Sequence, residues 1–315
     1  MTRSLQVLSL SDLRSGDEER RARFIDDLRA SMLDIGFFAL VDHGLDAALI
    51  ERAYAEVGRC FDRPLEARLA DRRPDLSHQR GYTPVGMEHA KDHTAPDLKE
   101  FWQVGRERKA GEEATFVDNV WPVGMDGFRT TIQHLFLDLD RVAMDLLRAT
   151  ALALGREATW LTTMAEGGNT IMRLIHYPPL GHDVPPGAVR SAEHEDINLI
   201  TLLIGSTASG LQVKDHDGSW IDVPPGHQHI IVDAGDMLQN LTNGLVRSTT
   251  HRVVNPDTSD TSRYSMPFFV HPRYDVDLAP QPEFIDQTGG EARFPSLDAR
   301  TYLHQRLREI GVEVD

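Results

Sequence analysis

Three ionisable residues stand directly in front of an apolar run in the stretch S-A-E-H-E-D-I-N-L-I-T-L-L, residues 191–203. On an extended strand alternate side chains share a face, so His194 and Asp196 lie on one face and Glu195 on the other. An imidazole and a carboxylate on one face are two of the three ligands of the 2-His-1-carboxylate triad that binds non-haem iron. The spacing therefore predicts a metal site that lacks one histidine. A bulge or a one-residue shift in register would exchange the two acids.

The missing ligand and a candidate anion site follow further along the chain. His251, in S-T-T-H-R-V-V-N-P, can complete the triad from a distant strand. In R-Y-S, alternation places Arg263 and Ser265 on the same face of a strand. A guanidinium beside a hydroxyl can hold a carboxylate through two hydrogen bonds. These residues predict a carboxylate-binding site as well as a metal site.

Helix and strand signals alternate in the N-terminal part. Residues 17–34 carry apolar side chains at helical spacing, and Gly36 ends that helix. The short strand F-F-A-L-V follows, and a turn at residues 42–44 closes it. We expect Asp46 to cap a helix that extends to about Phe61.

The central region contains the clearest helix. Residues 128–154 form one apolar stripe, and Gly155 stands where a C-terminal cap belongs. The polar segment 72–111 contains Pro74, Pro84 and Pro96, so we expect loops and short turns there. Residues 296–310 are predicted to be helical.

From residue 169 onward, short runs of Ile, Val and Leu are separated by Pro and Gly, with no helices expected between them. D-H-D-G at residues 215–218 indicates a hairpin turn. Many short strands of this kind predict a jelly roll or a barrel. The expected strands are T-I-M-R-L-I-H-Y, I-N-L-I-T-L-L-I, G-L-Q-V-K, W-I-D-V, H-I-I-V-D, H-R-V-V-N-P and R-Y-S-M-P-F-F-V-H.

The order of these motifs resembles the iron(II)/2-oxoglutarate-dependent dioxygenases, specifically the isopenicillin N synthase-like branch. H-E-D, a distant H and R-Y-S follow one another as in that family, and G-F-F-A-L-V-D-H-G is similar to its lead-in domain. Each motif is weak alone, but together they span nearly the whole chain. The core motifs are M-R-L-I-H-Y-P-P-L, G-L-Q-V, W-I-D-V-P-P, A-G-D-M-L-Q-N-L-T-N-G and M-P-F-F-V.

The resemblance implies a mainly β core, a double-stranded β-helix (jelly roll), with flanking α-helices and an N-terminal α/β lead-in. It divides the chain into a lead-in domain (1–126), a long helix plus the oxygenase core (127–274) and a C-terminal helical segment (275–315). It also implies that His194, Asp196 and His251 bind iron(II).

The same resemblance implies that 2-oxoglutarate is the co-substrate and chelates the iron through its keto acid end. Its far carboxylate would then meet Arg263, Ser265 and the hydroxyl of Tyr177, although Tyr177 could instead pack in the core. With dioxygen, such an enzyme releases succinate and CO2 while it hydroxylates, desaturates or cyclises a small molecule. Gln79 and Thr83 replace an Arg and a Tyr of the penicillin-forming enzyme, so isopenicillin N formation is not expected.

Three other functions fit parts of the pattern. An oxidase of the same fold would take all its electrons from the substrate and ignore 2-oxoglutarate. A non-enzymatic module would only bind a small ligand and would need no iron. A zinc hydrolase would leave Arg263 and Ser265 without a role.

Further histidines and two aromatic residues could also contribute to a site. His227 and His229 form the H-x-H of a cupin metal site, but a position at the rim of a turn is preferred after Pro224, Pro225 and Gly226. We expect His89 and His93 at the surface. Phe101 and Trp102 could line a pocket or pack in the core.

Composition limits the partners. The 315-residue chain is 40% hydrophobic and 26% charged, with a formal net charge of −16, which argues against nucleic acid or anionic lipid. Cys60 is the single cysteine, so no internal disulfide or thiolate metal site is possible. No apolar run reaches the ~18 residues of a membrane span. A cytoplasmic enzyme is expected, and its oligomeric state stays open.

Overall fold

The computed structural model describes residues 3–76, 79–89, 95–107, 116–180, 184, 187–256 and 261–310. In these residues the strands form two sheets, and only the β1–β2 pair is parallel. The larger sheet has the order β1 (Gln6–Ser9), β2 (Phe37–Val41), β10 (Ile230–Ala234), β7 (Ile200–Ile204), β12 (Arg263–Val270), β5 (Ile171–Tyr177), β4 (Glu100–Gly105), β3 (Gly81–Thr83). The smaller sheet has the order β6 (Ser191–His194), β11 (His251–Val253), β8 (Leu211–Lys214), β9 (Trp220–Asp222).

The two sheets share one apolar cluster, which gives the predicted jelly roll. Phe37, Ile175 and Ile231 of the larger sheet pack in this cluster with Leu211 and Val253 of the smaller sheet. Because these side chains line the space between the sheets, polar residues at either end of that space are held on a rigid frame.

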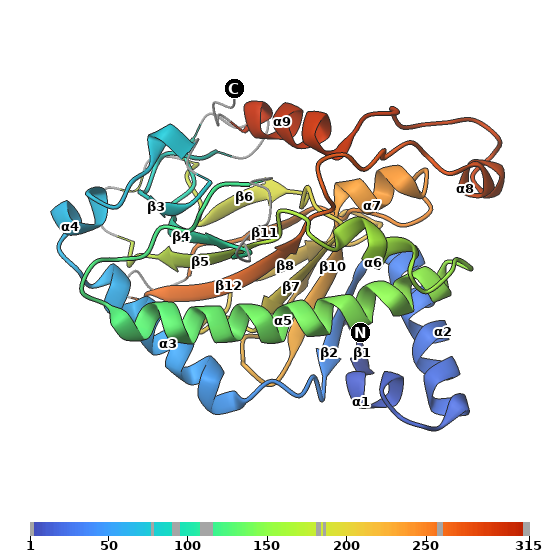
Figure 1. The fold of residues 1–315 in the computed structure, drawn as a ribbon, viewed down its shortest axis with the longest axis horizontal. Coiled ribbons are helices and arrows are strands. Elements are labelled where there is room, and N and C mark those ends of the chain that lie inside the picture. Colours follow the sequence, from blue (N-terminus) through green and yellow to red (C-terminus); the bar gives the residue numbers. More distant parts are fainter. Residues whose placement is uncertain are drawn as a thin grey trace.

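Helices cover the other face of the larger sheet. The long helix α5 (Asp126–Ala153) runs along this face beside α2 (Glu18–Asp34) and α3 (Ala47–Phe61) (Figure 1). The ring of Phe136 on α5 lies 4.9 Å from that of Phe268 on β12, edge to face. The remaining helices are α1 (Leu10–Leu13), α4 (Leu65–Leu69), α6 (Trp160–Ala165), α7 (Asp236–Leu241), α8 (Pro282–Gln287) and α9 (Ala299–Glu309), with a 3-10 turn at Pro74–Leu76.

The predicted helix ends have a clear local cause. Asp46 caps α3 by accepting a hydrogen bond from the backbone N–H of Ala48 at 2.9 Å. Gly155 follows α5 with φ +74°. Gly36 ends the first long helix with φ +69°, and a Cβ there would lie 2.2 Å from the carbonyl oxygen of Arg247. Only glycine fits at that position.

The expectation of loops across residues 72–111 is wrong for part of that segment. It contains strands β3 and β4, and β4 is buried along its whole length. The polar residues Glu100 and Gln103 interrupt the apolar pattern by which a buried strand is recognised in a sequence. In the folded chain each of them has a partner. Glu100 contacts Nδ1 of His176 at 2.8 Å, and Gln103 accepts from Nε of Arg173 at 2.8 Å.

Two further expectations need correction near the metal residues. The strand containing the apolar run begins at Ile200 instead of residue 197, because the Asn198 side chain donates to Ile200 O at 2.7 Å and turns the chain. A short helix, α7, stands between β10 and β11, where no helix was expected.

Strands from the predicted lead-in segment lie at both edges of the larger sheet: β1 and β2 at one edge, β3 and β4 at the other. The lead-in and the core therefore share one sheet. Among the helices of the described residues, none is both long and apolar enough to cross a membrane.

Candidate active site

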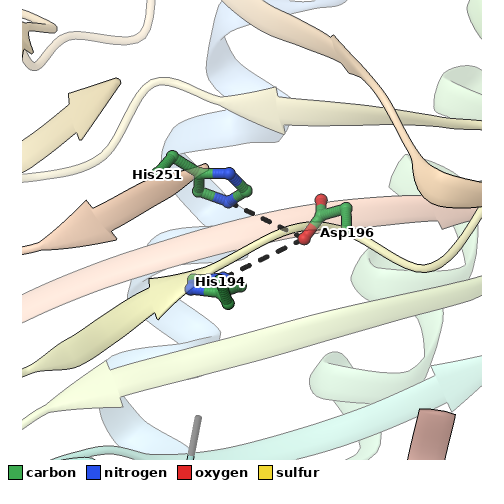
Figure 2. A group of neighbouring side chains, drawn as sticks. All are labelled: His194, Asp196 and His251. Carbon is green, nitrogen blue, oxygen red and sulfur yellow. Dashed lines mark ion pairs between the residues drawn. The ribbon is translucent and has the colours of Figure 1, made fainter. Parts of the chain in front are cut away.

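His194, Asp196 and His251 come together at one end of the space between the sheets (Figure 2). Nε2 of His194 lies 4.0 Å from Oδ1 of Asp196, and Nε2 of His251 lies 3.7 Å from the same oxygen. One ligand atom from each residue lies within 4.8 Å of the other two. Among the described residues, this is the one group of three or more His, Cys, Asp or Glu side chains close enough to hold a metal ion.

Hydrogen bonds to other groups turn these three ligand atoms toward one another. Nδ1 of His194 lies 2.7 Å from Ala192 O, and Nδ1 of His251 lies 3.2 Å from Thr249 O. A ring nitrogen that donates to a carbonyl leaves Nε2 with a free lone pair. The hydroxyl of Thr201 donates to Oδ2 of Asp196, which leaves Oδ1 facing the histidines. Two imidazoles and one carboxylate oxygen arranged in this way fit Fe(II).

Burial sets the charge of this cluster. Burial, together with the nearby His251, lowers the pKa of His194 to about 4, so the imidazole is neutral at pH 7. Burial and the charge of Asp196 raise the pKa of Asp233 well above its usual value. Burial and the negative charge nearby therefore favour the protonated form of Asp233.

Glu195 points elsewhere, but not for the reason that strand alternation gave. Strand β6 ends at His194, so Asp196 lies in the connection beyond it. The carboxylate of Glu195 accepts a hydrogen bond from the hydroxyl of Thr250, and this contact holds it away from the metal cluster. The side chains diverge as predicted, while the backbone that separates them is not a strand.

The predicted anion-binding residues line the same space. The cavity between the sheets, named here the inner cavity, is lined by Tyr177, Arg263 and Ser265 as well as by the three metal-cluster residues. Nη1 of Arg263 donates to Oγ of Ser265 at 3.3 Å, and its guanidinium carbon lies 4.9 Å from the centre of the Tyr177 ring. All three side chains are buried. The inner cavity is thus lined by the metal cluster and by a buried cation.

Arg190 is a second buried cation near Tyr177, and no motif in the sequence pointed to it. Its side chain has no exposed surface, and its guanidinium carbon lies 6.0 Å from the centre of the Tyr177 ring. One nitrogen donates to Thr261 O, whereas Nε and Nη1 have no hydrogen-bond partner. Burial and the neighbouring Arg263 lower the pKa of Arg190. No described carboxylate pairs with either Arg190 or Arg263.

A second cavity adjoins the inner cavity at the metal cluster and is named here the outer cavity. His194 and Asp196 line both cavities, so a molecule in the outer cavity would lie beside the metal. Helix α9 contributes to its wall through Leu303, Arg306 and Leu307. The sequence predicted this helix but not its position over the site.

The other candidate histidines divide into two groups. His227 and His229 lie at the turn before β10, as predicted, with contacts to Gly205 O at 2.7 Å and Pro224 O at 3.3 Å. His89 is half-buried and lines the outer cavity, so the expectation of a surface position is wrong. His93 lies outside the described residues.

The remaining candidates are buried or line the outer cavity. Phe101 and Trp102 both pack in the core, on opposite faces of β4. Gln79 lines the outer cavity, whereas Thr83 is buried in β3.

Comparisons with known proteins agree with this geometry. Residues 168–272 match the 2OG-Fe(II) oxygenase superfamily, and residues 5–124 match the N-terminal region of non-haem dioxygenases in morphine synthesis. The 2-oxoglutarate-dependent dioxygenase citB of Monascus ruber is 33% identical over 294 residues, which cover 88% of this chain and 86% of that protein. A 2-oxoglutarate-Fe(II) type oxidoreductase of Aspergillus fumigatus is 31% identical over 274 residues, 84% of this chain and 80% of that protein.

Solved structures share the fold over almost the full length. A Caulobacter crescentus protein of the 2OG-Fe(II) oxygenase family superposes with a TM-score of 0.86 at 36% identity, covering 98% of this chain and 99% of that one. A full-length Neurospora crassa protein in complex with α-ketoglutarate gives a TM-score of 0.85 at 29% identity, covering 96% and 95%. The chain belongs to the iron(II)- and 2-oxoglutarate-dependent oxygenase superfamily, and it is an oxidoreductase that uses both to oxidise a small molecule.

Proposed function

We propose that His194, Asp196 and His251 bind the catalytic Fe(II), and that Arg263, Ser265 and Tyr177 bind the far carboxylate of 2-oxoglutarate. The observation that carries this proposal is the shared cavity, which all six of these side chains line. The substrate itself would enter from the outer cavity.

The metal site is supported by the orientation of its donor atoms. The carbonyls of Ala192 and Thr249 hold the two imidazoles with Nε2 toward Asp196. Three protein ligands on one side of an ion leave the opposite side open for other molecules. Bound there, Fe(II) would couple the oxidation of 2-oxoglutarate to succinate and CO2 with the activation of dioxygen for attack on a substrate C–H bond.

The co-substrate site is supported by charge. Arg263 is buried and hydrogen-bonded to Ser265 and to Ala208 O, so its guanidinium is fixed in place before a ligand arrives. A carboxylate of 2-oxoglutarate would satisfy its remaining N–H groups and neutralise its charge. The ring of Tyr177 lies against this guanidinium and lines the same cavity, which supports a role for Tyr177 beside Arg263.

The test is to incubate the protein with Fe(II), 2-oxoglutarate and dioxygen and to measure succinate with and without a panel of small molecules. Thymine is a sensible first member, because the similar Neurospora crassa protein has also been solved with α-ketoglutarate and thymine. We expect succinate release that needs iron and rises with a true substrate. Substrate oxidation at full rate without 2-oxoglutarate would instead identify the oxidase. Absence of both iron binding and 2-oxoglutarate binding would identify the non-enzymatic module.

The setting of the enzyme is also a proposal. We infer a cytoplasmic location and no nucleic-acid partner. The single cysteine supports the cytoplasmic location. The formal net charge of −16 argues against a nucleic-acid partner.

A further inference from the structure

The outer cavity has a wall of alternating charges. Nζ of Lys99 lies 2.7 Å from Oδ2 of Asp97 and 3.7 Å from Oε2 of Glu88. The same oxygen of Glu88 lies 3.0 Å from Nη1 of Arg173. These four side chains therefore form one chain of ion pairs, in which every charge has an opposite neighbour. Their exposed fractions are small, from 5% for Asp97 to 18% for Arg173.

The cations of this wall are held in place. The guanidinium carbon of Arg173 lies 4.2 Å from the centre of the Phe101 ring and 5.7 Å from that of Phe269. Its Nε donates to Gln103 at 2.8 Å. Arg306 of α9, which also lines this cavity, pairs with Asp236 at 3.2 Å and with Glu309 at 2.8 Å. Thus each Lys or Arg that lines the outer cavity, within the described residues, already has a carboxylate.

Apart from the proposed metal ligand Asp196, Glu195 is the carboxylate lining this cavity that has no Lys or Arg partner among the described residues. Its Oε1 accepts from the hydroxyl of Thr250, but no cation of the described residues forms an ion pair with it. It lies next in sequence to the metal-cluster residues His194 and Asp196, which also line this cavity. A ligand bound beside the metal would therefore find an unpaired carboxylate and no unpaired cation.

The inner cavity has the opposite balance. Arg263, which lines it, has no described carboxylate partner, and neither has Arg190, whose guanidinium carbon lies 6.0 Å from the centre of the Tyr177 ring. We propose that the two cavities sort ligands by charge: the outer cavity accepts a neutral or cationic small molecule whose N–H group donates to Glu195, and it rejects carboxylates and phosphates. This inference rests on the proposed function, because it takes the outer cavity as the substrate site.

The physical reason for this selectivity is the unfavourable free energy of an anion in a cavity that offers it no free cation. A carboxylate in the outer cavity would have to displace Glu88, Asp97 or Asp236 from its cation, or remain beside Glu195. An amine or amide N–H instead gains an acceptor without breaking a pair. The same balance keeps a second molecule of 2-oxoglutarate out of the substrate site.

Benzylamine, benzamide and benzoate test this selectivity, because they present a cation, a neutral amide and an anion on the same ring. Binding is measured anaerobically at millimolar concentration by saturation-transfer NMR, on protein loaded with Fe(II) and 2-oxoglutarate. We expect benzylamine to bind best, benzamide less well and benzoate not at all. Benzoate binding as well as benzylamine, or no binding of benzylamine, would overturn the inference.

Glu195→Gln removes the unpaired charge and keeps the shape. We expect this variant to bind benzylamine about tenfold more weakly than the wild type, and to bind benzamide within about twofold of the wild-type affinity. Glu193→Gln is the matched control, since Glu193 is paired with Lys214 and Arg252, each at 3.2 Å, and does not line the cavity. An equal loss of benzylamine binding in both variants would show a general charge effect and contradict the role of Glu195.

A titration with 2-oxoglutarate in the same samples separates the two proposals. A wild-type protein that binds no 2-oxoglutarate contradicts the proposed function. A wild-type protein that binds it, but binds the three ring compounds in another order, contradicts only the charge selectivity.

Discussion

The hydroxyl of Thr201 donates a hydrogen bond to Oδ2 of Asp196, and this contact leaves Oδ1 as the oxygen that faces both histidines. Thr201 stands on β7 of the larger sheet, whereas Asp196 lies in the connection that leaves the smaller sheet. The contact therefore ties the metal cluster to the sheet that carries Arg263 and Ser265.

Replacing Thr201 by Val should weaken Fe(II) binding by roughly 10–100-fold, the usual effect of removing a hydrogen bond behind a metal ligand. Thr201→Ser keeps the hydroxyl and should restore most of the affinity. An anaerobic titration against a competing chelator measures both variants. Wild-type affinity in Thr201→Val would show that Asp196 needs no such support.

Arg263→Ala should retain iron and bind 2-oxoglutarate about tenfold more weakly or worse, because a charge-assisted contact is lost. Arg273→Ala is a suitable control, since that side chain is 39% exposed and pairs with Asp275. Anaerobic titration with 2-oxoglutarate, at saturating Fe(II), provides the comparison. Equal affinities in the two variants would remove Arg263 from the co-substrate site.

Arg190 should act on 2-oxoglutarate through Tyr177 and through its positive charge. Arg190→Met keeps the length of the side chain but removes the charge, and we expect the KM for 2-oxoglutarate to rise several-fold while kcat changes little. Arg190→Lys, which keeps the charge, should recover part of the loss. A fall in kcat with an unchanged KM for 2-oxoglutarate would instead point to a purely structural role for Arg190.

His271 should make the protein less stable at low pH. Burial lowers its pKa from 6.5 to about 4. Between these values the unfolded chain binds a proton that the folded chain does not, so the free energy of unfolding decreases as the pH falls through this window. Near pH 4.5 the titration of His271 has lowered the free energy of unfolding by roughly 2–3 kcal/mol.

His271→Gln should remove this part of the pH dependence. Urea unfolding of both proteins at pH 7 and pH 4.5 measures it, with both samples free of metal. The other titrating groups are the same in the two proteins, so their effects cancel. Identical pH dependence in the two proteins would mean that the pKa of His271 is the same in the folded and the unfolded chain.

Residue type and spacing were enough to predict which side chains gather at the site. The order and spacing of the motifs single out His194, Asp196 and His251. Helix ends at Asp46 and Gly155 follow from local hydrogen bonding and backbone conformation. The divergence of Glu195 from Asp196 was also predicted. Its cause is the hydrogen bonds from the hydroxyls of Thr250 and Thr201, and strand alternation cannot reveal these contacts.

Features set by tertiary contacts could not be predicted in this way. Strand β4 was missed because Glu100 and Gln103 are polar, and only the folded chain supplies their partners. Arg190 has no motif around it, so its burial beside Tyr177 is visible only in the structure. The place of α9 over the outer cavity depends on the packing of Leu303 and on the ion pair between Arg306 and Asp236.

The most direct test of the proposed iron site compares Asp196 with its neighbour Glu195. Asp196→Ala and Glu195→Ala are loaded with Fe(II) anaerobically, and iron content and succinate production without substrate are measured beside the wild type. Asp196→Ala should lose most of its iron and its succinate production, because the cluster loses its only negative ligand. Glu195→Ala should keep nearly all of its iron. Equal losses in the two variants, or a greater loss in Glu195→Ala, would contradict the assignment of Asp196 as the metal ligand.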